Sequence, residues 1–67
     1  MPDAIPGARY KDNVLDAEMI CNGVVAELEE DEEYHVVVLE YDGADRTISV
    51  PFRTFRDDDT IDLIEHP

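Results

Sequence analysis

The side chains best suited to bind a transition metal or to act as a nucleophile are few and widely separated. Cys21 is the only cysteine, and His35 and His66 are the only histidines. Zinc sites are usually marked by closely spaced pairs such as Cys-x-x-Cys or His-x-x-x-His, and neither pair occurs here. We therefore expect these three residues to be structural or exposed, and we expect no metal site.

Carboxylates are abundant, but their spacing does not match a cation-binding loop. The longest acidic runs are residues 29–33 and 57–59. An EF-hand loop needs alternating oxygen ligands, a glycine at its sixth position and a closing glutamate. Neither run has this pattern, which indicates solvated surface that attracts cations only loosely.

Nucleophilic catalysis needs a hydroxyl or thiol beside a base and an orienting group. No motif of this kind surrounds Ser49, Cys21 or the threonines, and the three glycines do not form a phosphate-binding loop. A chain of this size also has little room for a concave pocket. We expect no cofactor and no enzymatic activity.

The segment 46–56 is the one place where the acidic cover is broken. It holds both phenylalanines and three of the five Lys and Arg residues, namely Arg46, Arg53 and Arg56. Arginines interleaved with aromatic rings can bind single-stranded nucleic acid, but a net charge of −13 opposes that polymer over most of the surface. We interpret the phenylalanines as core and the arginines as partners of nearby carboxylates. If a protein partner is contacted, these three arginines are where we expect it.

Length and composition limit the class of protein. The 67 residues make one domain, residues 1–67, which hides only about 60% of the surface of its unfolded chain. One cysteine excludes an internal disulfide and favours a reducing compartment. No apolar run approaches the roughly 20 residues of a membrane span, and the first residues lack the pattern of a signal peptide. We expect a cytoplasmic protein.

The charge is the strongest compositional signal. Five Lys and Arg against eighteen Asp and Glu give 5 − 18 = −13. At about 1 M salt the Debye length falls to about 3 Å, so repulsion at this charge density is largely screened. The composition resembles that of the small acidic proteins of salt-loving archaea, and the resemblance implies an environment rather than an activity. A second interpretation is a nucleic-acid mimic that occupies a site on a DNA- or RNA-binding protein.

The positions of these side chains depend on the helices and strands that carry them. The element that the sequence predicts most clearly is a strand over residues 34–41. Its aliphatic and aromatic residues predict a strand that is apolar on both faces and therefore lies inside the sheet. One face would carry Val37, Leu39 and Tyr41, and the core covers it. The other would carry Tyr34, Val36 and Val38. A helix or a second copy of the chain must cover these three, so self-association is expected there.

The N-terminal third is the most ambiguous part. Residues 1–11 predict an extended, flexible arm. Asp12 or Asn13 can cap a short helix over residues 13–21, which Gly23 would end before a strand over 24–29. Two alternatives stay open: one longer helix reaching Leu28, and a single long strand with Gly23 at a bulge.

The remaining elements are read from turn signals. Residues 29–33 predict a hairpin loop of about five residues, and residues 42–45 predict a second hairpin loop around Asp-Gly. A strand over 46–50 ends at Pro51, which has no N–H to donate. Phe52 and Phe55 then fold under the sheet in one tight turn, before a last strand over 60–65 with Ile61 and Leu63 inward and Ile64 outward.

We therefore predict a mainly β fold with four antiparallel strands and a short N-terminal helix. The order of strands, with one helical turn before the last, resembles SH3-like small barrels; it allows a meander with the helix packed on one face equally well. No residue signature of such a family is present, so the resemblance implies no binding residues. The expected function is a small binding or regulatory module that acts through protein–protein contacts and self-association, with the nucleic-acid mimic as the alternative.

Overall fold

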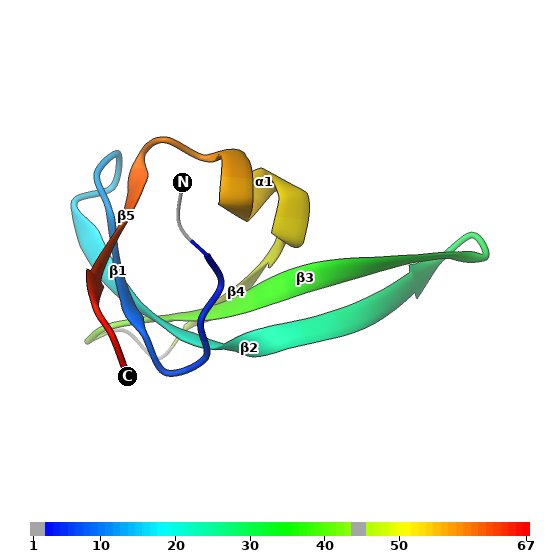
Figure 1. The fold of residues 1–67 in the computed structure, drawn as a ribbon, viewed down its shortest axis with the longest axis horizontal. Helices are drawn as coiled ribbons and strands as arrows, with labels where there is room; N and C mark the ends of the chain where they lie inside the picture. Colours follow the sequence, from blue (N-terminus) through cyan, green and yellow to red (C-terminus); the bar gives the residue numbers. More distant parts are fainter. Residues whose placement is uncertain (1–2, 44–45) are drawn as a thin grey trace.

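A long antiparallel hairpin forms the middle of the molecule. In the computed structural model, which describes residues 3–43 and 46–67, the hairpin consists of β2 (Ala17–Glu29) and β3 (Glu32–Tyr41). The other strands are β1 (Arg9–Asp12), β4 (Thr47–Pro51) and β5 (Ile61–Glu65), and the helix α1 (Phe52–Asp57) joins β4 to β5. All strand pairs are antiparallel, in the order β4-β3-β2-β1-β5 (Figure 1). The fold is thus mainly β, as predicted, but with five strands.

The prediction for residues 34–41 is confirmed, because β3 lies inside the sheet with β2 on one side and β4 on the other. Val37 and Leu39 are fully buried in the core. On the opposite face Val36 is also buried, flanked across the strands by Val25 and Pro51, whereas Val38 is half-buried. The single chain therefore shields most of this second face without help from a helix.

The predicted helix over residues 13–21 is wrong. Residues 13–16 form a turn, and the chain enters β2 at Ala17. The carboxylate of Asp12 accepts hydrogen bonds from the backbone N–H groups of Val14 (3.0 Å) and Leu15 (3.1 Å). The same side chain can cap a helix or close a turn, and here the turn is formed.

The long-strand alternative is the one observed. Met19 and Cys21 point inward with a period of two, and both are buried. The pairing with β3 shifts between Cys21 and Gly23, and Gly23 has a φ of 138°. Because of this bulge the strand continues to Glu29, and its side chains alternate between the two faces of the sheet both before and after the bulge.

The predicted flexible arm over residues 1–11 is also wrong for the residues that the structure describes. β1 pairs with β2 on one edge and β5 on the other, and Tyr10 is fully buried. The Tyr10 hydroxyl donates to the carbonyl oxygen of Asp3 and accepts from the N–H of Ile5 at 2.9 Å. These bonds fasten the preceding segment to the core; Met1 and Pro2 lie outside the described residues.

Both hairpins are present, but the first loop is shorter than predicted. Glu29 pairs with Glu32, so only Glu30 and Asp31 form the turn, both with positive φ (49° and 67°). Positive φ at both central positions is what a two-residue hairpin turn requires. In the second hairpin Tyr41 N–H donates to the carbonyl oxygen of Arg46 at 3.1 Å. Part of the predicted loop 42–45, at positions 44–45, lies outside the described residues.

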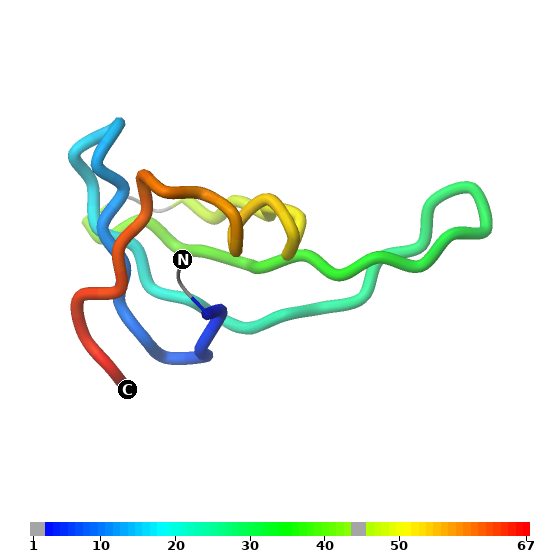
Figure 2. The backbone as a smooth tube through the Cα atoms, turned by 45° about the horizontal axis from the view of Figure 1, so that its top comes forward, coloured from blue at the N-terminus to red at the C-terminus, as the bar shows by residue number. Residues whose placement is uncertain are grey.

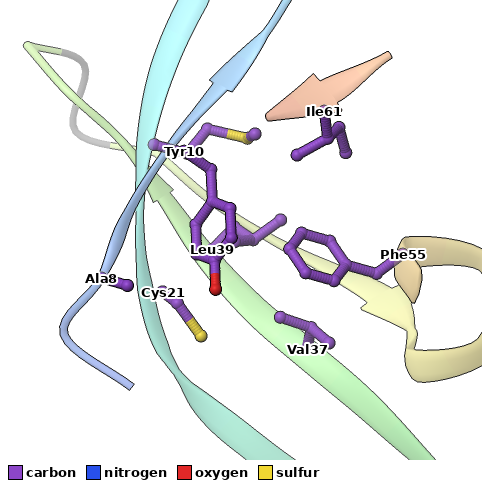
Figure 3. Close-up of a cluster of buried hydrophobic side chains, with 8 residues drawn as sticks. Ala8, Tyr10, Cys21, Val37, Leu39, Phe55 and Ile61 are labelled. Atoms are coloured by element: carbon purple, nitrogen blue, oxygen red, sulfur yellow. The ribbon is translucent and has the colours of Figure 1, made fainter. Parts of the chain in front are cut away.

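The core fills the space between the curled sheet and α1. β1 and β5 turn up toward the helix (Figure 1), and the Phe55 ring meets the Tyr10 ring edge-on with centroids 5.1 Å apart (Figure 3). Ile61 is buried, Leu63 is half-buried and Ile64 is 49% exposed, as predicted. Among the described residues β4 and β5 do not pair with each other, so the sheet does not close into a barrel.

The β2–β3 hairpin extends well beyond this core. Its outer half, which we define as residues 24–29 and 32–35, starts beside the end of β4, and the tip of the hairpin projects past the other elements along the 35 Å long axis of the molecule (Figure 2). β4 pairs only with residues 36–40 of β3, and β1 pairs only with residues 17–20 of β2. The outer half therefore has two unpaired edges within the part of the chain described.

Candidate functional site

The three arginines predicted to contact a partner fall in two places. Arg53 and Arg56 lie on α1, next to the end of β4. Arg46 lies opposite Tyr41 at the other end of that strand. Since Pro51 pairs with Val36, five residues along β3 separate the two places, or about 17 Å at 3.3 Å per residue. Only Arg53 and Arg56 can act together.

A groove lies between these arginines and the projecting hairpin. It is lined by residues 33–35 of β3 and by residues 51–54 and 56. The local cause is Pro51, which ends β4 and sends the chain into α1, so β3 loses its neighbour at residues 32–35. We call this the α1 groove. It combines a bare strand edge, the ring of Tyr34 and the cations of α1.

The charges of the groove are divided between its two ends. Arg56 Nε lies 3.3 Å from the Asp57 carboxylate, an exposed pair that contributes little to stability. Arg53 makes no ion pair with any residue that the structure describes. The outer end, beside Arg53, is lined by Glu29, Glu30, Glu32 and Glu33. Among residues 3–43 and 46–67, the predicted pairing of these three arginines with carboxylates is seen for Arg56, and Arg53 stays open to a ligand.

The three residues predicted to mediate self-association differ in accessibility. Tyr34 is 38% exposed and lines the α1 groove. Val36 is buried, and Val38 is half-buried opposite Gly23 and Ser49. Val36 therefore offers no free surface, and Tyr34 is the one of the three with substantial exposure.

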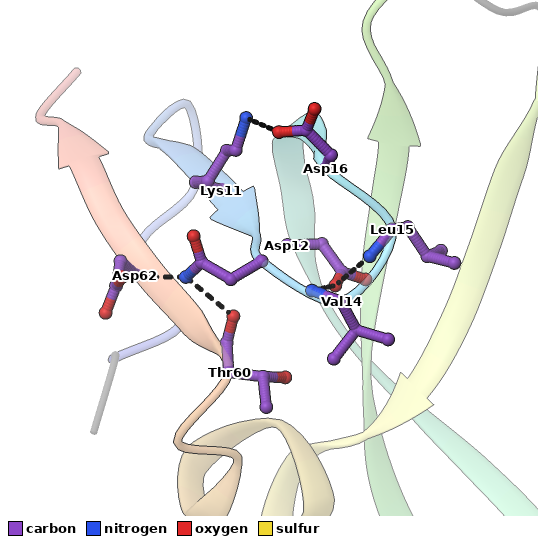
Figure 4. Close-up of polar contacts among 8 residues, drawn as sticks. Lys11, Asp12, Val14, Leu15, Asp16, Thr60 and Asp62 are labelled. Atoms are coloured by element: carbon purple, nitrogen blue, oxygen red, sulfur yellow. Dashed lines mark hydrogen bonds and ion pairs between the residues drawn. The ribbon is translucent and has the colours of Figure 1, made fainter.

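Two polar clusters elsewhere are structural. Arg9 lies 2.6 Å from Asp42 and 3.2 Å from Glu18, and these carboxylates raise its pKa. Near the turn after β1, Asn13 donates to the Thr60 carbonyl oxygen (3.0 Å) and to Asp62 (2.8 Å), which ties the turn to β5 (Figure 4). In both clusters the side chains bind neighbouring strands or turns of the same chain, which indicates a structural role.

The soft-metal candidates are apart from one another. Cys21 is buried, and burial raises the pKa of its thiol. His35 lies on the rim of the α1 groove, and His66 lies beyond β5. Across residues 3–43 and 46–67, no three His, Cys, Asp or Glu side chains gather into a possible metal site. The single helix described, α1, has too few residues to cross a membrane.

One surface was missed by the sequence reasoning. On the outer half, Val24 is 36% exposed, Val25 44% and Leu28 73%, along the unpaired edge of β2. The alternation of Val24, Ala26 and Leu28 was a signal for one apolar face. This alternation does not predict a free edge by itself, because nothing in the sequence indicates that β1 stops short of this region.

Comparisons of the chain with protein-family models, with curated proteins and with solved structures found no match.

Proposed function

We propose that this protein is a small, non-catalytic, self-associating binding module that acts through protein–protein contacts in a salt-rich cytoplasm, with the α1 groove as the surface that binds other proteins. The observation that carries the proposal is Arg53, an exposed cation without an ion pair among the described residues, beside Tyr34 and a bare strand edge. The strand order and the helical turn before β5 support a relationship to SH3-like small barrels.

The groove has the features that an extended peptide needs. Residues 32–35 of β3 can pair with an added strand through the main chain. Arg53 and Arg56 attract a carboxylate, and Tyr34 provides an amphipathic ring for packing. The ligand best suited to the groove is thus an extended segment that carries an acidic residue next to an apolar one.

The test is a capture experiment from cytosol at native salt with charge-reversed variants. We expect Arg53→Glu and Arg56→Glu to lose the partners that the unaltered protein captures. Arg46→Glu is the matched control, since it makes the same change of charge about 17 Å away, and it should keep them. Equal capture by all three variants would remove the groove from the proposal.

The salt-rich setting has its own test. With a net charge of −13, repulsion inside the chain falls as salt rises from 0.1 to 3 M. Circular dichroism should therefore report more folded protein, and a higher melting temperature, at 3 M. Full stability at 0.1 M would contradict salt adaptation.

A nucleic-acid mimic is the second candidate, favoured by the carboxylates of residues 29–33 gathered at the end of the projecting hairpin. A mimic should bind basic DNA- or RNA-binding proteins with an affinity that collapses as salt is added. Replacing these acidic residues by Gln or Asn would abolish mimicry and would leave capture by the α1 groove intact.

A further inference from the structure

The unpaired edge of β2 is bounded on both sides. At its inner end Cys21 is occupied, because its N–H donates to Ala8 O (3.0 Å) and its carbonyl accepts from Gly7 N–H (2.8 Å). At its outer end the strand stops at Glu29, before the Glu30–Asp31 turn. Asn22 is the bulge residue and has no partner in the ladder with β3, so the regular free edge runs over residues 23–29, and its midpoint is Ala26.

From this edge we propose that two copies of the chain join their β2 strands antiparallel, around a two-fold axis that passes through Ala26. The inference rests on the self-associating module proposed above and specifies how that module pairs. Long free strand edges with exposed apolar residues are templates for pairing with another chain. In a two-fold symmetric antiparallel pair, each residue lies opposite a residue of the other copy whose side chain is on the same face of the sheet. The register centred on Ala26 gives every residue of the free edge a partner.

This register also matches the side chains. Val24 faces Leu28 of the partner subunit, so the two large exposed apolar residues of one face cover each other across the interface. On the other face Val25 lies opposite the partner's Glu27, and Gly23 lies opposite the partner's Glu29. No acidic residue of this segment is directly opposite another.

Neighbouring registers are worse. An axis through Glu27 sets Glu27 against its own copy, and an axis through Leu28 sets Glu27 against Glu29; like charges directly opposite each other are destabilising in a sheet. An axis through Val25 would bring Glu29 opposite Cys21, where Gly7 and Ala8 already hold the edge. The length of the edge and its side-chain pattern thus lead to the same axis.

The charge of the chain sets the salt dependence of the dimer. Each copy carries −13, so association works against repulsion, and added salt screens that repulsion. The dissociation constant should therefore fall as KCl rises from 0.1 to 3 M. Electrostatic attraction to a basic protein would have the opposite dependence.

Cysteine cross-linking in the full chain tests the axis. Residues directly opposite in an antiparallel pair have Cα atoms about 4.5–5.5 Å apart, which a disulfide can span. Under mild oxidation at 3 M KCl, Ala26→Cys should form a covalent dimer by itself. Leu28→Cys alone should not, because its two copies would lie about 13 Å apart along the strands, but a mixture with Val24→Cys should cross-link. Cys21 is buried and does not compete.

Sedimentation provides the second readout. Leu28→Lys should give a monomer with unchanged circular dichroism, while Leu15→Lys, at a similarly exposed position (62% against 73%) in the turn after β1, should remain a dimer. A dimer that cross-links elsewhere would overturn the Ala26 axis and leave the self-associating module standing. A monomer up to hundreds of micromolar at 3 M KCl would overturn both, whereas capture at the α1 groove is decided separately by the arginine variants. The Ala26→Cys variant could instead cross-link to a different protein while the unaltered chain stays monomeric. That result would also overturn pairing between two copies of the chain.

Discussion

Removing the hydroxyl of Tyr10 is the sharpest test of how the N-terminal segment is held. In Tyr10→Phe the ring keeps its edge-on contact with Phe55, but the N–H of Ile5 and the carbonyl of Asp3 lose their partner. A buried hydrogen bond contributes about 0.5–1.5 kcal/mol net. The two bonds together give an expected loss of about 1–3 kcal/mol.

That loss is large for this chain. At about 0.05–0.15 kcal/mol per residue, 67 residues give a total unfolding free energy of about 3–10 kcal/mol. The melting temperature should fall by about 4–8 °C for each kcal/mol lost. Urea and thermal unfolding at 3 M KCl, followed by circular dichroism, would measure both quantities.

The matched control is Tyr34→Phe, which deletes the same atom from a ring that is 38% exposed and has no hydrogen bond to the described residues. It should change the unfolding free energy by less than about 0.5 kcal/mol. Equal effects of the two substitutions would refute the reasoning, since the hydroxyl of Tyr10 would then hold nothing in place.

Three more changes test the strands and the core. Gly23→Ala should cost about 1 kcal/mol or more, because a φ of 138° is strained for any side chain even though no atom lies within 4 Å of the added carbon; an unchanged denaturation midpoint would contradict this. The buried Cys21 thiol, whose pKa is raised by burial, should react with iodoacetamide only as fast as the chain unfolds, and rapid labelling of folded protein would disprove its placement. Burial also raises the pKa of Tyr10, so the folded state holds that proton more tightly than the unfolded chain; the unfolding free energy should therefore decline as pH rises above about 10, and less so in Tyr10→Phe.

The parts of the fold that the sequence predicted are those with redundant signals. The strand over residues 34–41 combines β-branched residues, alternation and flanking turns, and each of these indicates the same element. Phe52 and Phe55 were placed beneath the sheet by their spacing, and Phe55 is indeed fully buried. In these segments local preference and tertiary packing agree.

The predicted helix and the predicted N-terminal arm are wrong because the same local residues are compatible with two different structures. Asp12 can cap a helix or close a turn, and Val14 and Leu15 look like the apolar side of a helix although they are 72% and 62% exposed. In β1 only Tyr10 is a large apolar residue, so the segment resembles a terminal arm until its pairing with both β2 and β5 is known.

The candidate site was predicted in pieces. Arg53, Arg56 and Tyr34 were each singled out, but for separate reasons. Their meeting in one groove depends on β4 ending at Pro51 beside Val36, which is a matter of register. Similarly, the free edge of β2 exists because β1 covers only residues 17–20 of a longer strand, and strand lengths are set by the whole sheet.

Because the hairpin projects from the core, backbone amide protons in the two parts of the molecule should differ in their protection against hydrogen exchange. Amide protons of residues 37–39, deep in the sheet, should exchange with deuterium only when the whole chain opens, whereas those of residues 32–35 should exchange through local fraying. The same fraying exposes residues 29–33 to a glutamate-specific protease, which would nick the tip and leave the core in one piece. Proteolytic degradation of this protein would then begin at the tip of the β2–β3 hairpin.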